Sequence, residues 1–317
     1  MRLSIRKTVL AAAGVTALAA GLTVATSPLA AHRADAAISC STSASGNGPF
    51  YPGPDASKAY DARFSQSFGL PDLSTHTPQG VAIWRNWDGK KHDIFLLVSY
   101  HSGQHARIYG ITPSGGSVGA LEIADTHAGG IAVVGNWVYV ENNSTSIRKY
   151  RTSDIRTGLN HRRGYLYVKS VGTPRKVYGA SFLTAYGSYI FSGKFNENGR
   201  DKMYAYKVNS NGSLTTQAGA IQVPTKTQGV AVLSDRYIFS TSYGRGNRGN
   251  IYVVKRGYKS LDSAKLSCFR SPSMNEGAVA YGSYVYVVYE SGSYEYRSGA
   301  RNPITHAHKG LLSKLTA

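Results

Sequence analysis

Short apolar and aromatic runs recur along the whole chain, separated by segments rich in glycine, serine and asparagine. Residues 94–99 read IFLLVS and residues 284–289 read YVYVVY, so β-branched and aromatic side chains dominate both runs. Runs of this length and composition between turn residues are typical of β-strands. The only helical turn that the pattern suggests lies near residues 261–264. The sequence therefore predicts an all-β protein.

The strand pattern has a period. A glycine opens a short apolar run at intervals of 48–50 residues, at Gly80, Gly130, Gly179, Gly229 and Gly277. A strand–turn–strand unit that repeats every 40–50 residues or so is characteristic of β-propeller blades. Six or seven blades would leave only about 40 residues for each blade. We therefore expect a single β-propeller with five blades of four antiparallel strands.

The fourth strands of the blades are the least regular part of this pattern. We expect them at residues 165–170 in the second repeat and 217–223 in the third. The fifth repeat ends with residues 309–315 and is one strand short. Residues 59–68 alternate like a strand, and we expect them to supply that strand and close the ring, because closure removes open sheet edges.

The N-terminus has the features of a secretory signal peptide. A basic start is followed by an alanine-rich apolar run, and Ala34-Asp35-Ala36 fits a small-x-small cleavage site. The alternatives are a membrane anchor, which glycine and threonine interruptions disfavour, and a lipoprotein signal ending at Cys40, which lacks the usual leucine. We expect a signal peptide at 1–36, an extended Gly-, Ser- and Pro-rich lead-in at 37–58, and the propeller at 59–317. The protein is therefore expected to be secreted, extracellular and without a membrane span.

The chain has two cysteines, Cys40 and Cys268, both in the part that would be exported. Disulfides persist in extracellular compartments, so one intramolecular bridge is expected. This bridge would hold the N-terminal segment beside the end of the fourth repeat.

The chain is strongly basic. Removal of residues 1–36 would take away four basic side chains and one acidic side chain and lower the formal charge from +19 to +16. A field of this sign attracts anionic polymers such as those of a cell wall, although the charge could also serve only solubility. The basic residues are scattered and no nucleic-acid-binding signature is present, so nucleic acid is not an expected partner. We expect a monomer.

Propeller topology places the candidate site. The loops that lead into the innermost strands and the loops between second and third strands meet at one mouth of the central channel, where convergent polar groups would bind a ligand or a secreted protein. The alternative is that these groups only cap strand ends and hold channel water. The candidate binding residues are Gln79, His101, His127, Tyr178, Lys194, Gln228, Tyr243, Arg245, Glu276, Tyr289 and Glu290.

Catalytic signals are sparse. Glu276 is a candidate general acid or base, with His127 or His101 as its partner, if burial raises the pKa of its carboxyl group. No nucleophile elbow of the Gly-x-Ser-x-Gly type occurs. The pairs His101/His105 and His306/His308 have spacings that metals use, but loop histidines are more often solvated, so neither a metal nor another cofactor is expected.

Three segments resemble the plant-type glutaminyl cyclases, which are five-bladed propellers. They are Thr227-Gln228-Gly229-Val230, the loop 240–246 (STSYGRG) and Asn275-Glu276-Gly277. The resemblance implies an acyl- or amidotransfer enzyme in which Glu276 shuttles a proton. In export, size and general character the chain also resembles secreted bacterial propellers that include the dispase autolysis-inducing protein, which implies a non-enzymatic binding protein. We favour a secreted binding or interaction protein, with the cyclase-like enzyme as the alternative.

Overall fold

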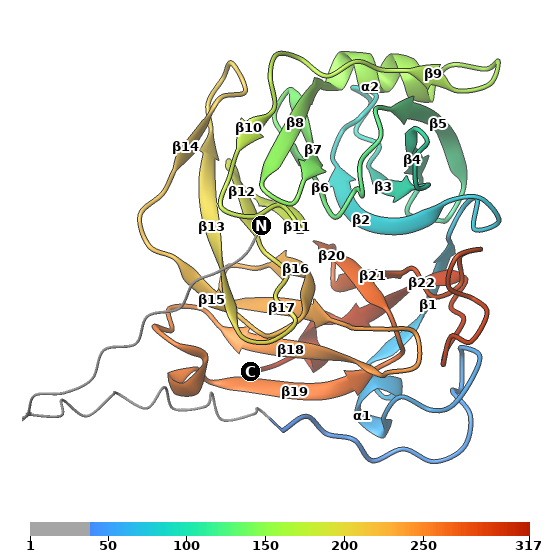
Figure 1. Ribbon diagram of the computed structural model, residues 1–317, viewed down its shortest axis with the longest axis vertical. Coiled ribbons are helices and arrows are strands. Elements are labelled where there is room, and N and C mark those ends of the chain that lie inside the picture. Colours follow the sequence, from blue (N-terminus) through green and yellow to red (C-terminus); the bar gives the residue numbers. More distant parts are fainter. Residues whose placement is uncertain (1–38) are drawn as a thin grey trace, which may run out of the picture. The chain divides into compact units, whose positions relative to one another are not determined.

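The computed structural model describes residues 39–317, so the expected signal peptide lies outside the described residues (Figure 1). Five sheets are arranged as a five-bladed β-propeller, which confirms the expected fold class. Among the strands β1 to β22 of residues 39–317, all pairs are antiparallel except the pair of β5 and β9. None of the helices in the described part of the chain has the length and hydrophobicity of a transmembrane segment.

Each blade is one sheet, with its innermost strand given first. Blade 1 contains β2 (Thr77–Trp84), β3 (Ile94–Tyr100), β4 (Ala106–Ile111), β5 (Ser117–Ile123) and β9 (Leu166–Tyr167). Blade 2 contains β6 (Ile131–Val134), β7 (Trp137–Asn143), β8 (Ser146–Arg151) and β10 (Arg175–Lys176). Blade 3 contains β11 (Phe182–Tyr186), β12 (Tyr189–Gly193), β13 (Asp201–Val208), β14 (Leu214–Thr216) and β15 (Ile221–Val223).

Blade 4 contains β16 (Thr227–Val232), β17 (Arg236–Thr241), β18 (Gly249–Lys255) and β19 (Leu266–Ser271). Blade 5 contains β20 (Asn275–Tyr281), β21 (Tyr284–Tyr289), β22 (His306–Leu311) and β1 (Phe64–Gly69). The helical segments are α1 (Lys58–Asp61), α2 (Thr152–Leu159) and the 3₁₀ turns η1 (Leu261–Ser263) and η2 (Leu312–Lys314).

The repeated glycines mark where innermost strands of neighbouring blades approach closely. A Cβ atom on Gly80 would lie 2.8 Å from the Cα atom of Gly130, and one on Gly277 would lie 2.7 Å from the carbonyl oxygen of Gln79. Real Cβ contacts are not this short, so only glycine fits at these positions. Gly179 differs, because it lies before β11 and its added Cβ would meet the side chain of Lys194 in the same blade.

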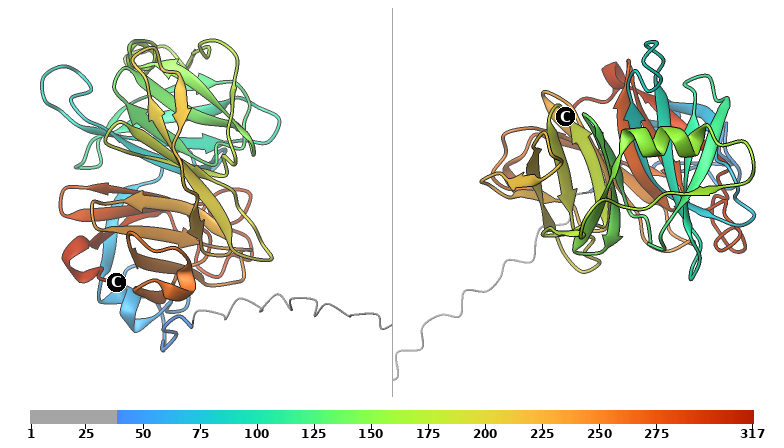
Figure 2. Two further views of the ribbon diagram at one scale, coloured as in Figure 1. Left: turned by 90° about the vertical axis from the view of Figure 1, so that its left-hand side faces the viewer. Right: turned by 90° about the horizontal axis from the view of Figure 1, so that it is seen from above.

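Two expected fourth strands are wrong. In the second repeat, α2 follows β8 and carries the chain to blade 1, where Leu166 pairs in parallel with Leu121 of β5. The buried side chains of Ile155 and Leu159 explain this path, because they pack in the core that blades 1 and 2 share. Figure 2 shows α2 on the outside of these blades. The sequence reading missed this helix because it is short and has few apolar residues.

In the third repeat, the expected single strand at 217–223 is also wrong. β14 and β15 are separate strands that pair with opposite ends of β13, Thr216 opposite Tyr206 and Ile221 opposite Met203. A segment around Gly219, which has a positive φ of 89°, separates them. Glycine adopts this backbone conformation readily, so the chain turns there instead of continuing as one strand.

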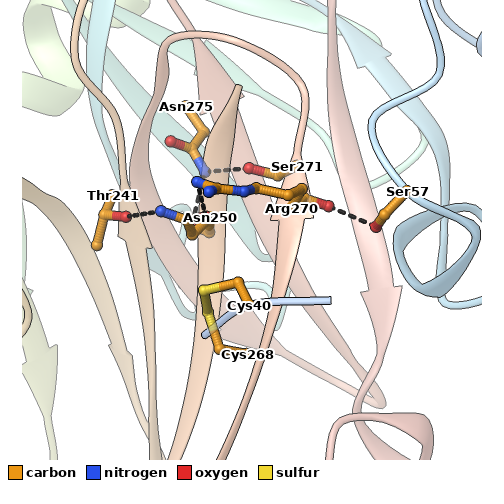
Figure 3. The surroundings of a disulfide bond; sticks show 8 residues. All are labelled: Cys40, Ser57, Thr241, Asn250, Cys268, Arg270, Ser271 and Asn275. Atoms are coloured by element: carbon orange, nitrogen blue, oxygen red, sulfur yellow. Dashed lines mark hydrogen bonds between the residues drawn. A yellow bond between two sulfur atoms is a disulfide. The ribbon is translucent and has the colours of Figure 1, made fainter. Parts of the chain in front are cut away.

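The N-terminal segment packs onto blades 4 and 5. β1 is the outer strand of blade 5, with Phe64 paired to Gly310 of β22. β22 begins at His306, three residues before the expected start. The disulfide between Cys40 and Cys268 is present, as predicted (Figure 3).

Candidate functional site

Three polar residues lie where innermost strands begin, immediately before the repeated glycines. Gln79 is in β2, Gln228 in β16 and Glu276 in β20, and at each of them the pairing with the next strand shifts its register. Such bulges leave a residue out of the ladder and redirect its side chain. The same local irregularity in three blades therefore aims three polar side chains at one mouth of the ring.

These side chains meet Glu290, which follows β21, in one hydrogen-bonded cluster. Gln79 Nε2 donates to Glu290 Oε2 at 2.6 Å, and Gln228 Nε2 donates to Glu276 Oε1 at 3.0 Å. Ser242 Oγ donates to the same Glu276 oxygen at 3.4 Å, and the two carboxyl groups hydrogen-bond to each other. The cluster therefore joins blades 1, 4 and 5. We call these five residues the glutamate cluster.

The two glutamates hold a proton. Glu276 is 1 % exposed, and burial, followed by the charge of Glu290, raises the pKa of its carboxyl group well above the ordinary value. Burial is also the main cause that raises the pKa of Glu290. Two carboxylates in contact away from water cannot both be charged at low cost, so the pair retains a proton at neutral pH.

The long loop 290–305 connects β21 and β22 and begins at Glu290 of the glutamate cluster. It contacts blade 1, where Thr77 Oγ1 donates to Ser293 Oγ at 3.1 Å and the Tyr100 hydroxyl donates to Glu295 Oε2 at 3.0 Å. Tyr296 completes this contact, with its hydroxyl 2.9 Å from that of Tyr100. Glu295 and Tyr296 were not predicted from the sequence. The unusual length of the segment between β21 and β22 is the feature that could have drawn attention to them.

Two of the candidate residues lie at the rim of the mouth. The His127 ring centroid lies 4.5 Å from that of Tyr100, and the Arg245 guanidinium lies 5.1 Å from the ring centroid of Tyr296. The rim therefore carries tyrosine rings, a histidine and a guanidinium outside the buried carboxyl pair.

The remaining candidates do not join the glutamate cluster. His101 Nδ1 hydrogen-bonds to the Thr75 carbonyl at 2.6 Å, and Lys194 and Tyr243 are exposed. Tyr178 is exposed and donates from its hydroxyl to Asp201 Oδ1 at 2.6 Å.

Tyr289 points into the core, where its hydroxyl lies 2.5 Å from that of Tyr60. Glu290, the next residue along the chain, reaches the cluster.

Blade 2 has a different residue immediately before its repeated glycine. Gly129 stands where blades 1, 4 and 5 have a glutamine or glutamate, and its N–H donates to Glu141 Oε2 at 2.7 Å. Burial raises the pKa of Glu141, which lies on β7. The sequence analysis missed this residue because it is on the second strand of its blade and not at the repeated position.

The opposite mouth of the ring has a cavity of about 650 Å³. Its lining comes from the far ends of all five innermost strands and includes Trp84, Val133, Tyr186, Leu233 and Tyr281. Within residues 39–317, no group of three or more His, Cys, Asp or Glu residues has a geometry that could hold a metal ion.

No protein-family model matches the sequence, and no curated protein matches it. Among solved structures, the chain is similar to BamB from Moraxella catarrhalis, with a TM-score of 0.30 and 10 % identity over 78 % of this chain and 99 % of that chain. It is also similar to an ACO/RPE65 chimera, with a TM-score of 0.23 and 12 % identity over 86 % of this chain and 58 % of that chain.

Proposed function

We propose that the protein is a secreted binding protein, in which the mouth bearing the glutamate cluster takes a polar ligand and the basic surface associates with anionic wall polymer. The observation that carries this proposal is the convergence of Gln79, Gln228, Glu276 and Glu290 from three blades. The cluster fixes the blades against one another, and a rigid frame lets the rim residues bind with little loss of conformational entropy.

Binding fits the geometry better than catalysis does. Glu276 is 1 % exposed and already hydrogen-bonded to Gln228, Ser242 and Glu290. A proton shuttle must reach the reacting atom, whereas a buried carboxyl pair can position the rim without touching the ligand. The contact surface would instead come from His127, Tyr296 and Arg245, since Tyr100 beneath them is buried.

The direct test uses cell-wall sacculi that carry anionic polymer and measures co-sedimentation of the protein. Binding should weaken steeply between roughly 50 and 500 mM salt, because exposed charges are screened. Salt-independent binding would contradict the role of the basic surface.

The contribution of the mouth is tested by the same co-sedimentation at high salt. Salt screens the attraction between exposed charges, so the binding that remains comes from short-range contacts. Tyr296→Ala should lose this binding, because it removes a ring from the rim. The matched control is Tyr186→Ala, which removes an exposed tyrosine at the opposite cavity. Equal losses in the two variants, or full binding by Tyr296→Ala, would refute the proposed site.

The second candidate is the glutaminyl-cyclase-like enzyme. It is favoured by the raised pKa of Glu276, because a carboxyl group that holds a proton at neutral pH can donate it. The test is incubation with a peptide that begins with glutamine, followed by mass spectrometry for loss of ammonia. Cyclisation that disappears in Glu276→Gln would establish the enzyme and overturn the binding proposal; no turnover at high protein concentration would exclude it.

A further inference from the structure

A cavity of about 570 Å³ lies on blade 4, near the ends of β17, β18 and β19. Its walls include an unusual set of side chains: Lys226, Tyr243, Arg248, Tyr252, Arg270 and Arg301. We call it the blade-4 pocket. Ser242 connects it to the glutamate cluster, because this residue lines the pocket and also donates to Glu276.

The lining has four cationic side chains and no carboxylate. None of the ion pairs found within residues 39–317 involves any of these four. Two acidic residues approach the pocket without lining it: Asp55, whose backbone carbonyl accepts from Arg248, and Glu276, which accepts from Ser242. Like charges that share one cavity repel each other, so the bare pocket is electrostatically unfavourable and an anion would relieve that repulsion.

The cations are held by neutral groups, which leaves their charge unmatched. Arg270 Nη1 donates to Asn250 Oδ1 at 2.8 Å, and Arg248 Nη2 donates to the Asp55 carbonyl at 2.9 Å. The Lys226 ammonium lies 4.6 Å from the ring centroid of Tyr243. The Nε atoms of Arg248 and Arg301 are buried without an acceptor. The lining offers these cations no carboxylate, so an oxyanion in the pocket would supply the missing negative charge.

The pocket wall is rigid before any ligand binds. Arg270 and Cys268 are two residues apart on β19, so their side chains share one face of the strand, and Cys268 is bonded to Cys40 (Figure 3). The acceptor of Arg270, Asn250, is itself fixed, because its Nδ2 donates to Thr241 Oγ1 at 3.2 Å and its carbonyl accepts from Asn275 Nδ2 at 3.1 Å. The guanidinium is therefore positioned in advance, which reduces the entropy that binding would cost.

We propose that the blade-4 pocket binds a phosphate ester of a small polar molecule such as a sugar. Guanidinium groups match the geometry of phosphate oxygens, and several cations together suit a group with up to two negative charges. The rings of Tyr243, which is 45 % exposed, and Tyr252 supply faces for the uncharged part of the ligand. This site does not depend on the function proposed for the mouth.

The test is isothermal titration of the full secreted chain with glucose 6-phosphate and with inorganic phosphate at low ionic strength. One equivalent of glucose 6-phosphate should bind, and inorganic phosphate should compete for the same site. Lys226→Gln and Arg301→Gln should each weaken binding at least about tenfold, because each removes a charge-assisted hydrogen bond. The charge-matched control is Lys207→Gln, an exposed residue of β13 outside the pocket, which should bind as the wild type does.

Two pocket variants are used so that a loss of phosphate binding can be distinguished from a loss of folding. Arg301 is partly buried with an unpartnered Nε atom, so its variant is compared with the wild type by thermal unfolding, while Lys226→Gln removes an ammonium that only overlies a ring. Absence of binding by both probes, or equal weakening by Lys207→Gln, would overturn the proposal. Glucuronate that binds as tightly as glucose 6-phosphate would overturn the assignment to phosphate. None of these outcomes depends on wall binding or on Glu276.

Discussion

The disulfide should account for a large part of the stability of the propeller. The perturbation is the double variant Cys40→Ser, Cys268→Ser, which removes both sulfur atoms and leaves no free thiol. The bridge spans 228 residues, and a cross-link of this length lowers the entropy of the unfolded chain by an amount worth about 5 kcal/mol at 25 °C.

The full value applies only if both ends of the bridge belong to the folded core. Cys268 lies in β19, and the segment beyond Cys40 is docked along it, because Ser41 N donates to the Cys268 carbonyl and the Ser41 carbonyl accepts from Arg270 N, both at 3.0 Å. Further along, Tyr51 and Ala56 are buried. The bridge therefore constrains the fold and not a loose tail, and most of the estimate should be realised.

Thermal and urea unfolding of the purified protein, followed by circular dichroism, measure the effect. The double variant should unfold roughly 10 °C below the wild type, given the size of the domain. The control is the wild type in a reducing agent, which should match the variant, while the same agent should leave the variant unchanged. A midpoint within about 2 °C of the wild type would refute the reasoning, because it would show that the unfolded chain gains little freedom when the bridge is absent.

Three further predictions concern buried groups and the repeated glycines. The raised pKa values of Glu276 and Glu290 mean that the folded state holds a proton that the unfolded state releases, so the free energy of unfolding should fall as pH rises above about 4.5. Glu276→Gln should flatten this decline in urea titrations, and a profile as steep as the wild type's would contradict it. Burial lowers the pKa of His308 to about 3, so the free energy of unfolding should also fall as pH drops from about 6.5 towards 3. His308→Gln should flatten this decline at acid pH, and an unchanged decline would exclude His308 as its cause. Gly277→Ala should cost about 1–3 kcal/mol by overpacking, whereas Gly199→Ala, with open space around its added Cβ, should cost less than 1; equal costs would show that close strand approach does not explain the repeat.

The blade count could be predicted from the sequence because close packing between neighbouring blades requires a glycine at one position of the innermost strand. Neighbouring innermost strands come so close at Gly80 and Gly277 that no side chain fits, and the repeated glycines of blades 1, 2, 4 and 5 all make such a contact with the neighbouring blade. Gln79, Gln228 and Glu276 were found by the same logic, since they precede these glycines. Position in the repeat was therefore enough to bring these three residues together in the glutamate cluster.

Side-chain direction and irregular segments could not be predicted in this way. Tyr289 and Glu290 were grouped because they are adjacent, yet one reaches Tyr60 in the core and the other reaches Gln79 at the mouth. Tyr178 precedes a repeated glycine, but Gly179 lies outside β11. The Tyr178 side chain therefore lies outside the glutamate cluster, and its hydroxyl donates to Asp201. Glu295 and Tyr296 reach their positions through a long loop whose path depends on contacts with distant blades.

The pairing of β1 with β22 has a consequence for the order in which the chain can fold. Phe64 in β1 pairs with Gly310 in β22, so β1 is synthesised well before the strand with which it pairs. Contacts between residues so far apart in sequence make folding slow, and an unpaired strand is exposed to association with other chains in the meantime. Cys268 precedes β22, so the bond to Cys40 can form while the last blade is still incomplete. The bond would then hold β1 close to blade 4, beside the position that β22 occupies in the folded protein. The pairing of β1 with β22 would no longer require two distant parts of the chain to meet by diffusion.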